Sequence, residues 1–117
     1  MVRIYLAGPM TNQPYFNYEK FMDMEGYLSH VRGYEVFNPI RHDIKKYGME
    51  AIQACPNGTK EEAEAVGISY KTCLRDDLCW IIDNADAIAL LPGWEQSKGC
   101  RAEKALAECL GLEEVYL

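Results

Sequence analysis

The sequence predicts a single α/β domain, a three-layer Rossmann- or flavodoxin-like fold with a parallel sheet of four to five strands. Short apolar runs alternate with amphipathic segments in the order β-α-β-α-β-α-β, which is typical of a parallel sheet covered on both faces. The length of 117 residues is that of one domain. Right-handed crossovers favour a strand order of about 2-1-3-4, with the switch point between the first and third strands.

The strands are predicted from apolar runs that stop at turn-forming residues. Gly8-Pro9 follows the first run, Asn38-Pro39 the second and Pro92-Gly93 the third. The third run is the clearest, because every residue after its first is apolar. The four expected strands cover residues 4–7, 34–37, 86–91 and 115–117.

Three longer helices are predicted from the spacing of apolar residues and from capping residues. The first spans residues 17–31 with Asn17 as its cap, the second spans 69–84, and the third starts at Ser97 or Gly99. Their inner faces are expected to consist of Phe21, Met24, Leu28 and Val31, then of Leu74, Leu78, Ile81 and Ile82, and finally of Ala102, Ala105, Leu106, Cys109 and Leu110.

Residues 41–68 have the weakest pattern and are interpreted as a helical insertion in the domain. Residues 44–54 fit a helix, and residues 55–58 read as a turn. Thr59 and Glu62 then have the spacing of a capping box, which predicts the start of another helix.

Composition and charge exclude several classes of protein. The chain has 12 Lys and Arg against 18 Asp and Glu, a net charge of −6, so we expect no binding to a nucleic-acid polymer. Its five cysteines are odd in number and contain no C-x-x-C pair, so neither a disulfide framework nor a zinc site is predicted. No apolar run exceeds five residues, whereas a membrane span needs about twenty. We therefore expect a cytoplasmic protein without a membrane partner.

The carboxyl ends of the strands are expected to surround one ligand crevice. Gly8 would allow the backbone to approach a ligand closely, although a strand followed by Gly-Pro is also an ordinary turn. Trp94 either stacks on a base or packs at the end of its strand. The residues placed around the crevice are Gly8, Pro9, Met10, Asn38, Pro39, Pro92, Gly93 and Trp94.

Three polar residues are candidates for chemistry at this crevice. Ser97 lies with Gly99 in a loop that opens a helix, where backbone N–H groups can hold an anion. Glu103 lies next to the apolar stripe of that helix, where a carboxylate can be partly desolvated. Asp77 could approach from the preceding helix. For both carboxylates, a solvated, charged helix face is the competing interpretation.

Several motifs together resemble the nucleoside 2-deoxyribosyltransferase-like superfamily, in a branch found in phages and bacteria. They are YLAGPM at 5–10, EVFNP at 35–39, RDDL at 75–78, DAIALLPGW at 86–94 and Ser-x-Gly-x-x-x-Glu at 97–103. The resemblance covers most of the chain except about residues 41–68. It implies cleavage of the N-glycosidic bond of 2′-deoxynucleosides or their 5′-monophosphates.

The resemblance also implies roles for single residues. Glu103 would be the nucleophile at the sugar C1′, and Tyr5 would contact it. Asp77 would bind sugar or base and act as proton donor. Ser97 would bind the phosphate, and Gly8 would lie near the ligand. Neither a metal nor another cofactor is implied, and a homodimer is expected because relatives build the site at a subunit interface.

The leading hypothesis is an N-glycosidase that acts on a (deoxy)nucleoside 5′-monophosphate. Lys98 and Arg101, close to Glu103, either favour a phosphate or signal a different ligand. A second hypothesis is a nucleoside deoxyribosyltransferase. It is disfavoured because only four strands are predicted, whereas the resemblance implies a fifth strand and a C-terminal active-site residue for the transferases. A non-catalytic nucleotide-binding or sensing module and a structural or interaction protein also stay open, because a fold does not by itself imply a function.

Overall fold

The sheet has four strands, all parallel, in the order β2-β1-β3-β4. The computed structural model describes all 117 residues. The predicted fold class and strand order are therefore confirmed, with a sheet of four strands. The strands are β1 (Arg3–Ala7), β2 (Glu35–Phe37), β3 (Ala87–Leu90) and β4 (Glu113–Tyr116).

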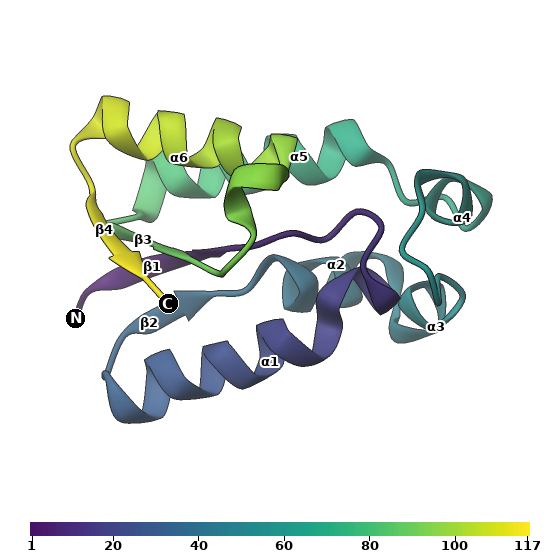
Figure 1. The fold of residues 1–117 in the computed structure, drawn as a ribbon, viewed down its shortest axis with the longest axis horizontal. Helices are drawn as coiled ribbons and strands as arrows, with labels where there is room; N and C mark the ends of the chain where they lie inside the picture. Colours follow the sequence, from purple (N-terminus) through teal and green to yellow (C-terminus); the bar gives the residue numbers. More distant parts are fainter.

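Helices cover both faces of the sheet, so the domain has three layers (Figure 1). Alternate residues of β1 and β3 point to opposite faces, and two separate apolar clusters result. Ile4 and Leu6 pack with Phe21 and Leu28 on one face, which is covered by α1 (Tyr18–Gly26). The other face is covered by α5 (Tyr70–Asn84) and α6 (Lys98–Leu110), and its buried cluster consists of Tyr5, Ala7, Ile81, Ile88, Leu90, Cys100 and Ala107.

The segment 41–68 is helical and gathers beyond the carboxyl ends of the strands (Figure 1). It holds most of α2 (Pro39–Tyr47), together with α3 (Met49–Gln53) and α4 (Lys60–Ala65). The predicted capping box is confirmed, because the Thr59 and Glu62 side chains bond each other's backbone N–H groups. The helix expected over 44–54 is wrong: Gly48, at φ 93°, separates α2 from α3. None of the helices is long and apolar enough to cross a membrane.

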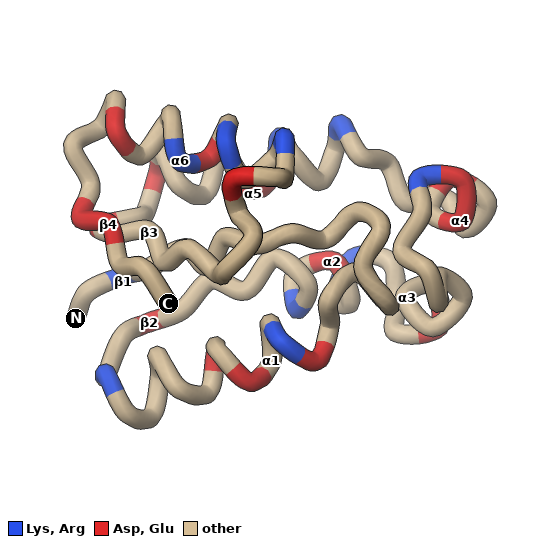
Figure 2. The backbone as a smooth tube through the Cα atoms, in the orientation of Figure 1, with Lys and Arg blue, Asp and Glu red and all other residues tan.

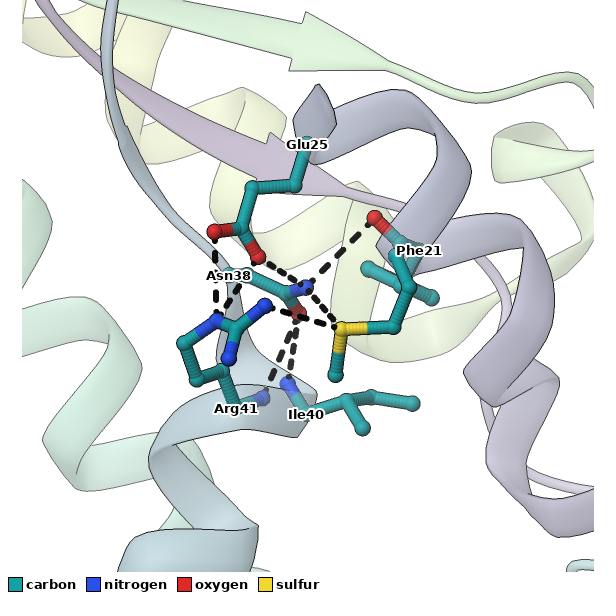
Figure 3. Close-up of polar contacts among 6 residues, drawn as sticks. Phe21, Glu25, Asn38, Ile40 and Arg41 are labelled. Atoms are coloured by element: carbon teal, nitrogen blue, oxygen red, sulfur yellow. Dashed lines mark hydrogen bonds and ion pairs between the residues drawn. The ribbon is translucent and has the colours of Figure 1, made fainter. Parts of the chain in front are cut away.

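Asn38 starts α2 and does not simply close a strand (Figure 3). Its Oδ1 accepts hydrogen bonds from the backbone N–H groups of Ile40 at 3.0 Å and Arg41 at 3.4 Å, which satisfies free donors of the first helical turn. Its Nδ2 donates to Glu25 Oε1 at 2.8 Å. Pro39 follows at the first helical position, where a missing N–H costs nothing. The polar groups of Asn38 are thus committed to joining α1 to α2.

The first predicted helix differs from the structure at both ends. Asn17 is left-handed at φ 67° and does not cap α1; its Nδ2 donates instead to the carbonyl of Pro9 at 3.1 Å. The helix continues past Gly26 as the π-helical segment η2 (Tyr27–Val31). A π turn takes up more residues than an α turn, which rotates Val31 out of the stripe and leaves it 70% exposed.

The inner faces predicted for α5 and α6 are partly wrong. Ile82 is 57% exposed, and Asp77 is buried on the face that was expected to be wholly apolar. In α6 the buried residues are Cys100, Glu103 and Ala107. Small residues lie all around α6, so its apolar pattern fixes no unique face. The residues expected on its inner face that are exposed instead are Ala102, Ala105, Cys109 and Leu110.

The loop after β1 is hydrogen-bonded to the segment between α3 and α4. The backbone N–H of Asn12 donates to the carbonyl of Gly58 at 2.8 Å. A Cβ at position 58 would lie 2.1 Å from the carbonyl oxygen of Gln13, and Gly58 also has a left-handed φ of 63°. Only glycine allows this approach in this conformation.

We expect Gly58→Ala to lower the free energy of unfolding by about 2–4 kcal/mol, from overpacking and backbone strain together. Gly67→Ala is the matched control, because Gly67 has φ 81° but nothing within 4 Å of a Cβ. The control should lose only about 1 kcal/mol, the usual cost of a left-handed φ. Urea unfolding of both variants measures the difference, and equal losses would contradict the contact with Gln13.

Candidate functional site

A cavity of about 590 Å³ opens at the carboxyl ends of β1 and β3. This is the edge of the sheet where ligands bind in open α/β folds, and the volume lies in the range of small-molecule sites. Figure 2 shows that the loop after β1, which forms part of the wall, carries no Lys, Arg, Asp or Glu. The acidic lining comes instead from three helices, which contribute Asp43, Asp77 and Glu103.

Glu103 is one of three buried acids in the cavity. It is 6% exposed, and its Oε2 accepts a hydrogen bond from the Tyr5 hydroxyl at 2.7 Å. Burial raises the pKa of Glu103 to about 7, and the bond from Tyr5 opposes this shift. Burial and the neighbouring charge of Glu103 raise the pKa of Tyr5 well above 10. Tyr5 is therefore a neutral donor that holds the carboxylate in one orientation.

The Tyr5 ring is held in place by aromatic neighbours. It stacks on Phe37 at a centroid distance of 5.6 Å, and Phe37 stacks on Trp80 at 4.7 Å. Such contacts restrict the side chain and contribute about 1 kcal/mol for each pair beyond area burial. The orientation of Glu103 thus depends on a packed aromatic group on β1, β2 and α5.

Asp77 faces the same cavity from α5 and is 6% exposed. Burial raises its pKa to about 8, and the charges of Glu103 and Asp43 add to the effect. Its Oδ1 is buried and has no hydrogen-bond partner in the chain. At neutral pH this group is a carboxylic acid beside a carboxylate of lower pKa, an arrangement found in pairs of catalytic acids and bases.

The N-terminus of α6 forms another part of the cavity wall. Ser97, one of the two predicted starting residues, caps the helix, and its Oγ accepts a hydrogen bond from the N–H of Cys100 at 3.2 Å. The hydroxyl hydrogen of Ser97 stays available to a ligand. Lys98 and Gly99 line the cavity beside it. A capped helix start with a lysine next to it suits an anionic group.

The structure brings most of the predicted site residues together. Those that line the cavity are Tyr5, Gly8, Pro9, Met10, Pro39, Asp77, Ser97, Gly99 and Glu103. The side chain of Asn38 is committed to the junction of α1 and α2, and Gly93 does not line the cavity. Trp94 packs at the end of its strand: its ring lies 6.3 Å from that of Tyr116, and Lys104 Nζ lies 5.3 Å from its centroid.

Sequence reasoning missed Asp43 and Tyr70. Asp43 lies on α2 and is 5% exposed, and burial raises its pKa to about 6, against the effect of the Cys73 thiol. Tyr70 starts α5, and its hydroxyl lies 3.4 Å from where a Cβ of Gly99 would be. Asp43 lies on the same buried face of α2 as Pro39 and Ile40, and this spacing could have indicated its burial. The face can be recognised in the sequence only if the helix is taken to start after Asn38 as its N-cap.

No group of three or more His, Cys, Asp or Glu side chains is arranged to hold a metal ion. The three cavity carboxyls come from different helices, and each has its own burial and neighbours. Together the buried acid pair, the tyrosine and the helix start line one ligand-sized cavity at the sheet edge of an α/β protein.

Comparison with known families places the chain more narrowly. Residues 2–116 match the family described as a domain of unknown function, DUF4406, and the chain belongs to that family. No curated protein and no solved structure is significantly similar to the chain.

Proposed function

We propose that this protein is an N-glycosidase that cleaves (deoxy)nucleoside 5′-monophosphates, with Glu103 as the nucleophile. The observation that carries the proposal is the Glu103 carboxyl, buried in a ligand-sized cavity and bonded by Tyr5 at 2.7 Å. Glycosidases cleave their substrates with two such groups, a carboxylate and a second carboxyl group of raised pKa. The resemblance of the motifs to the nucleoside 2-deoxyribosyltransferase-like superfamily supports the same chemistry.

In the proposed first step, a Glu103 oxygen forms a bond to C1′ as the C1′–N bond breaks. C1′ becomes cationic in the transition state, so an adjacent carboxylate stabilises it before the bond forms. The Tyr5 hydroxyl keeps one oxygen occupied and leaves the other for C1′. The base departs with the electron pair of the broken bond.

Asp77 is proposed to protonate the departing base. Burial and the nearby charge of Glu103 raise its pKa to about 8, so it carries a proton at neutral pH. In the second step, the Asp77 carboxylate accepts a proton from water as the water oxygen attacks C1′ and releases Glu103. This exchange of roles between two carboxyl groups is the one that retaining glycosidases use.

The phosphate is proposed to lie at the N-terminus of α6. Ser97 and Gly99 contribute backbone and hydroxyl donors there, and Lys98 contributes a positive charge. We expect Ser97→Ala to lower kcat/KM for a nucleoside 5′-monophosphate about tenfold, the value of one hydrogen bond to a charged group. The free nucleoside should be affected far less.

Ser97→Thr is the matched control for this prediction, because threonine keeps both the hydroxyl and the helix cap. Steady-state release of base from the nucleotide and from its nucleoside measures the two effects. Equal losses on both substrates would mean that Ser97 acts on the stability of α6 and not on a phosphate.

The direct test of the proposed function is incubation with ribo- and deoxyribonucleoside 5′-monophosphates, followed by chromatography for free base and sugar phosphate. Release of both products supports the hydrolase. Transfer of the sugar to an added second base would make the protein a deoxyribosyltransferase. Tight binding without turnover would make it a nucleotide-binding or sensing module.

The proposal places the protein in the cytoplasm, where nucleotides are abundant and thiols stay reduced. All five cysteines are free, in agreement with that compartment. A homodimer, which the resemblance implies, stays a prediction. One chain supplies both carboxyls, Tyr5 and the helix start of the cavity.

A further inference from the structure

The α2–α4 side of the cavity has a buried acid that the proposed chemistry does not use. Asp43 is 5% exposed, lines the cavity and has an Oδ1 without any hydrogen-bond partner in the chain. An unpaired polar atom in a buried place costs free energy. A hydrogen-bond donor on a ligand would remove that cost.

The surroundings of Asp43 restrict what such a ligand can be. The cavity wall on this side is mainly apolar, and its polar lining residues besides Asp43 include Lys60 and Cys73; the apolar residues are Pro39, Ile52, Ala63, Ile68 and Leu74. His42 and Lys46 both bond Asp76, at 3.1 and 2.8 Å, and neither lines the cavity. The complementary group therefore has apolar faces and a polar, hydrogen-donating edge. A nucleobase has this combination.

The position of this wall agrees with the order of groups in a nucleotide. The start of α6 offers the anion site, and Glu103 lies six residues further on, about 9 Å along the helix axis. Asp77 and Asp43 lie on α5 and α2, and the charges of Asp43 and Glu103 both raise the pKa of Asp77. Phosphate, sugar and base would follow one another from Ser97 past Glu103 towards Asp43.

We propose that Asp43 and the apolar wall from α2 to α5 form a base-recognition subsite that selects bases with an exocyclic amino group. The inference rests on the proposed function. A carboxylate only accepts hydrogen bonds, so it matches the amino group of adenine or cytosine and not the carbonyl oxygen of hypoxanthine or uracil. Asp43 is on this account a specificity-determining residue.

The test compares two pairs of substrates that differ in one amino or oxo group. These are the 5′-monophosphates of deoxyadenosine and deoxyinosine, and those of deoxycytidine and deoxyuridine. For the wild type we expect kcat/KM to favour the amino member of at least one pair about tenfold or more. In Asp43→Ala the ratio should fall to about threefold or less, with turnover of the oxo member retained.

Glu50→Gln is the control, because it removes a charge from an exposed position of α3 outside the cavity. It should keep the wild-type ratio. An unchanged ratio in a folded Asp43→Ala protein would overturn the proposal. So would a wild-type preference for the oxo member of both pairs.

Calorimetric binding separates this proposal from the proposed reaction. The same four nucleotides are titrated into Glu103→Gln, with and without Asp43→Ala. Tighter binding of the amino nucleotides that depends on Asp43 supports the subsite, even where the wild type releases no base. Equal affinities, or no binding of any of the four, would overturn it.

Discussion

Glu103→Gln is expected to reduce base release at least about a thousandfold, the scale on which removal of a nucleophile acts. Glutamine has nearly the same shape, and its amide oxygen still accepts the hydrogen bond from Tyr5. It has no negative charge to stabilise a cationic C1′ and forms no ester with it. The variant should also be at least as stable as the wild type, because the site already disfavours the charged form of Glu103.

Base release by chromatography and thermal unfolding measure the two effects together. Glu108→Gln is the matched control: it lies on the same helix, five residues further on, and pairs with Lys104 on the exposed side. It should keep full activity. A Glu103→Gln protein that folds and still releases base would contradict the proposed mechanism.

The activity should have a maximum between about pH 7 and pH 8. The first step needs an ionised Glu103 and a protonated Asp77. Burial raises the pKa of Glu103 to about 7, so activity falls as the pH drops below that value. Burial, with the charge of Glu103, raises the pKa of Asp77 to about 8, so activity falls again as the pH rises beyond it. The two carboxyls interact, and the two limbs belong to the pair.

Asp77→Asn should remove the alkaline limb and lower kcat/KM about a hundredfold, the usual contribution of a general acid. An amide has no proton to transfer to the base. A nucleotide of 7-methylguanine offers the sharpest comparison, because its base is already cationic and leaves without protonation. In a single turnover, the variant should release this base almost as fast as the wild type does, because Asp77 acts as a base only in the second step, after the nucleobase has left. An equal loss on both substrates would show that Asp77 binds or positions substrate and does not protonate it.

The strands and the order of the sheet could be predicted from the sequence because they depend on local patterns. Uninterrupted apolar runs marked β1 and β3, and right-handed crossovers left few strand orders. Tyr5, Asp77 and Glu103 were found through motifs whose residues lie far apart in the chain. The structure adds the contact that motifs alone did not show, the 2.7 Å bond between Tyr5 and Glu103.

The wrong predictions of buried helix faces have two physical causes. Apolar spacing assumes that buried helix faces are apolar, and α5 and α6 bury the acids Asp77 and Glu103. It also assumes ideal α-helices, whereas η2 is a π-helical turn that rotates Val31 outwards. Asp43 was missed because residues 41–68 form short helices beyond the carboxyl ends of the strands, so their burial depends on tertiary contacts and leaves little periodicity.

The division of the cavity between two parts of the chain has an evolutionary consequence. Glu103, Asp77 and Tyr5 belong to the sheet and its covering helices, whereas much of the opposite wall comes from one continuous stretch between β2 and α5. Loops and short helices at a sheet end accept insertions and deletions more readily than the core does. We therefore expect this stretch to vary between related chains more than the sheet does, which would change the substrate while the proposed carboxyl chemistry is kept.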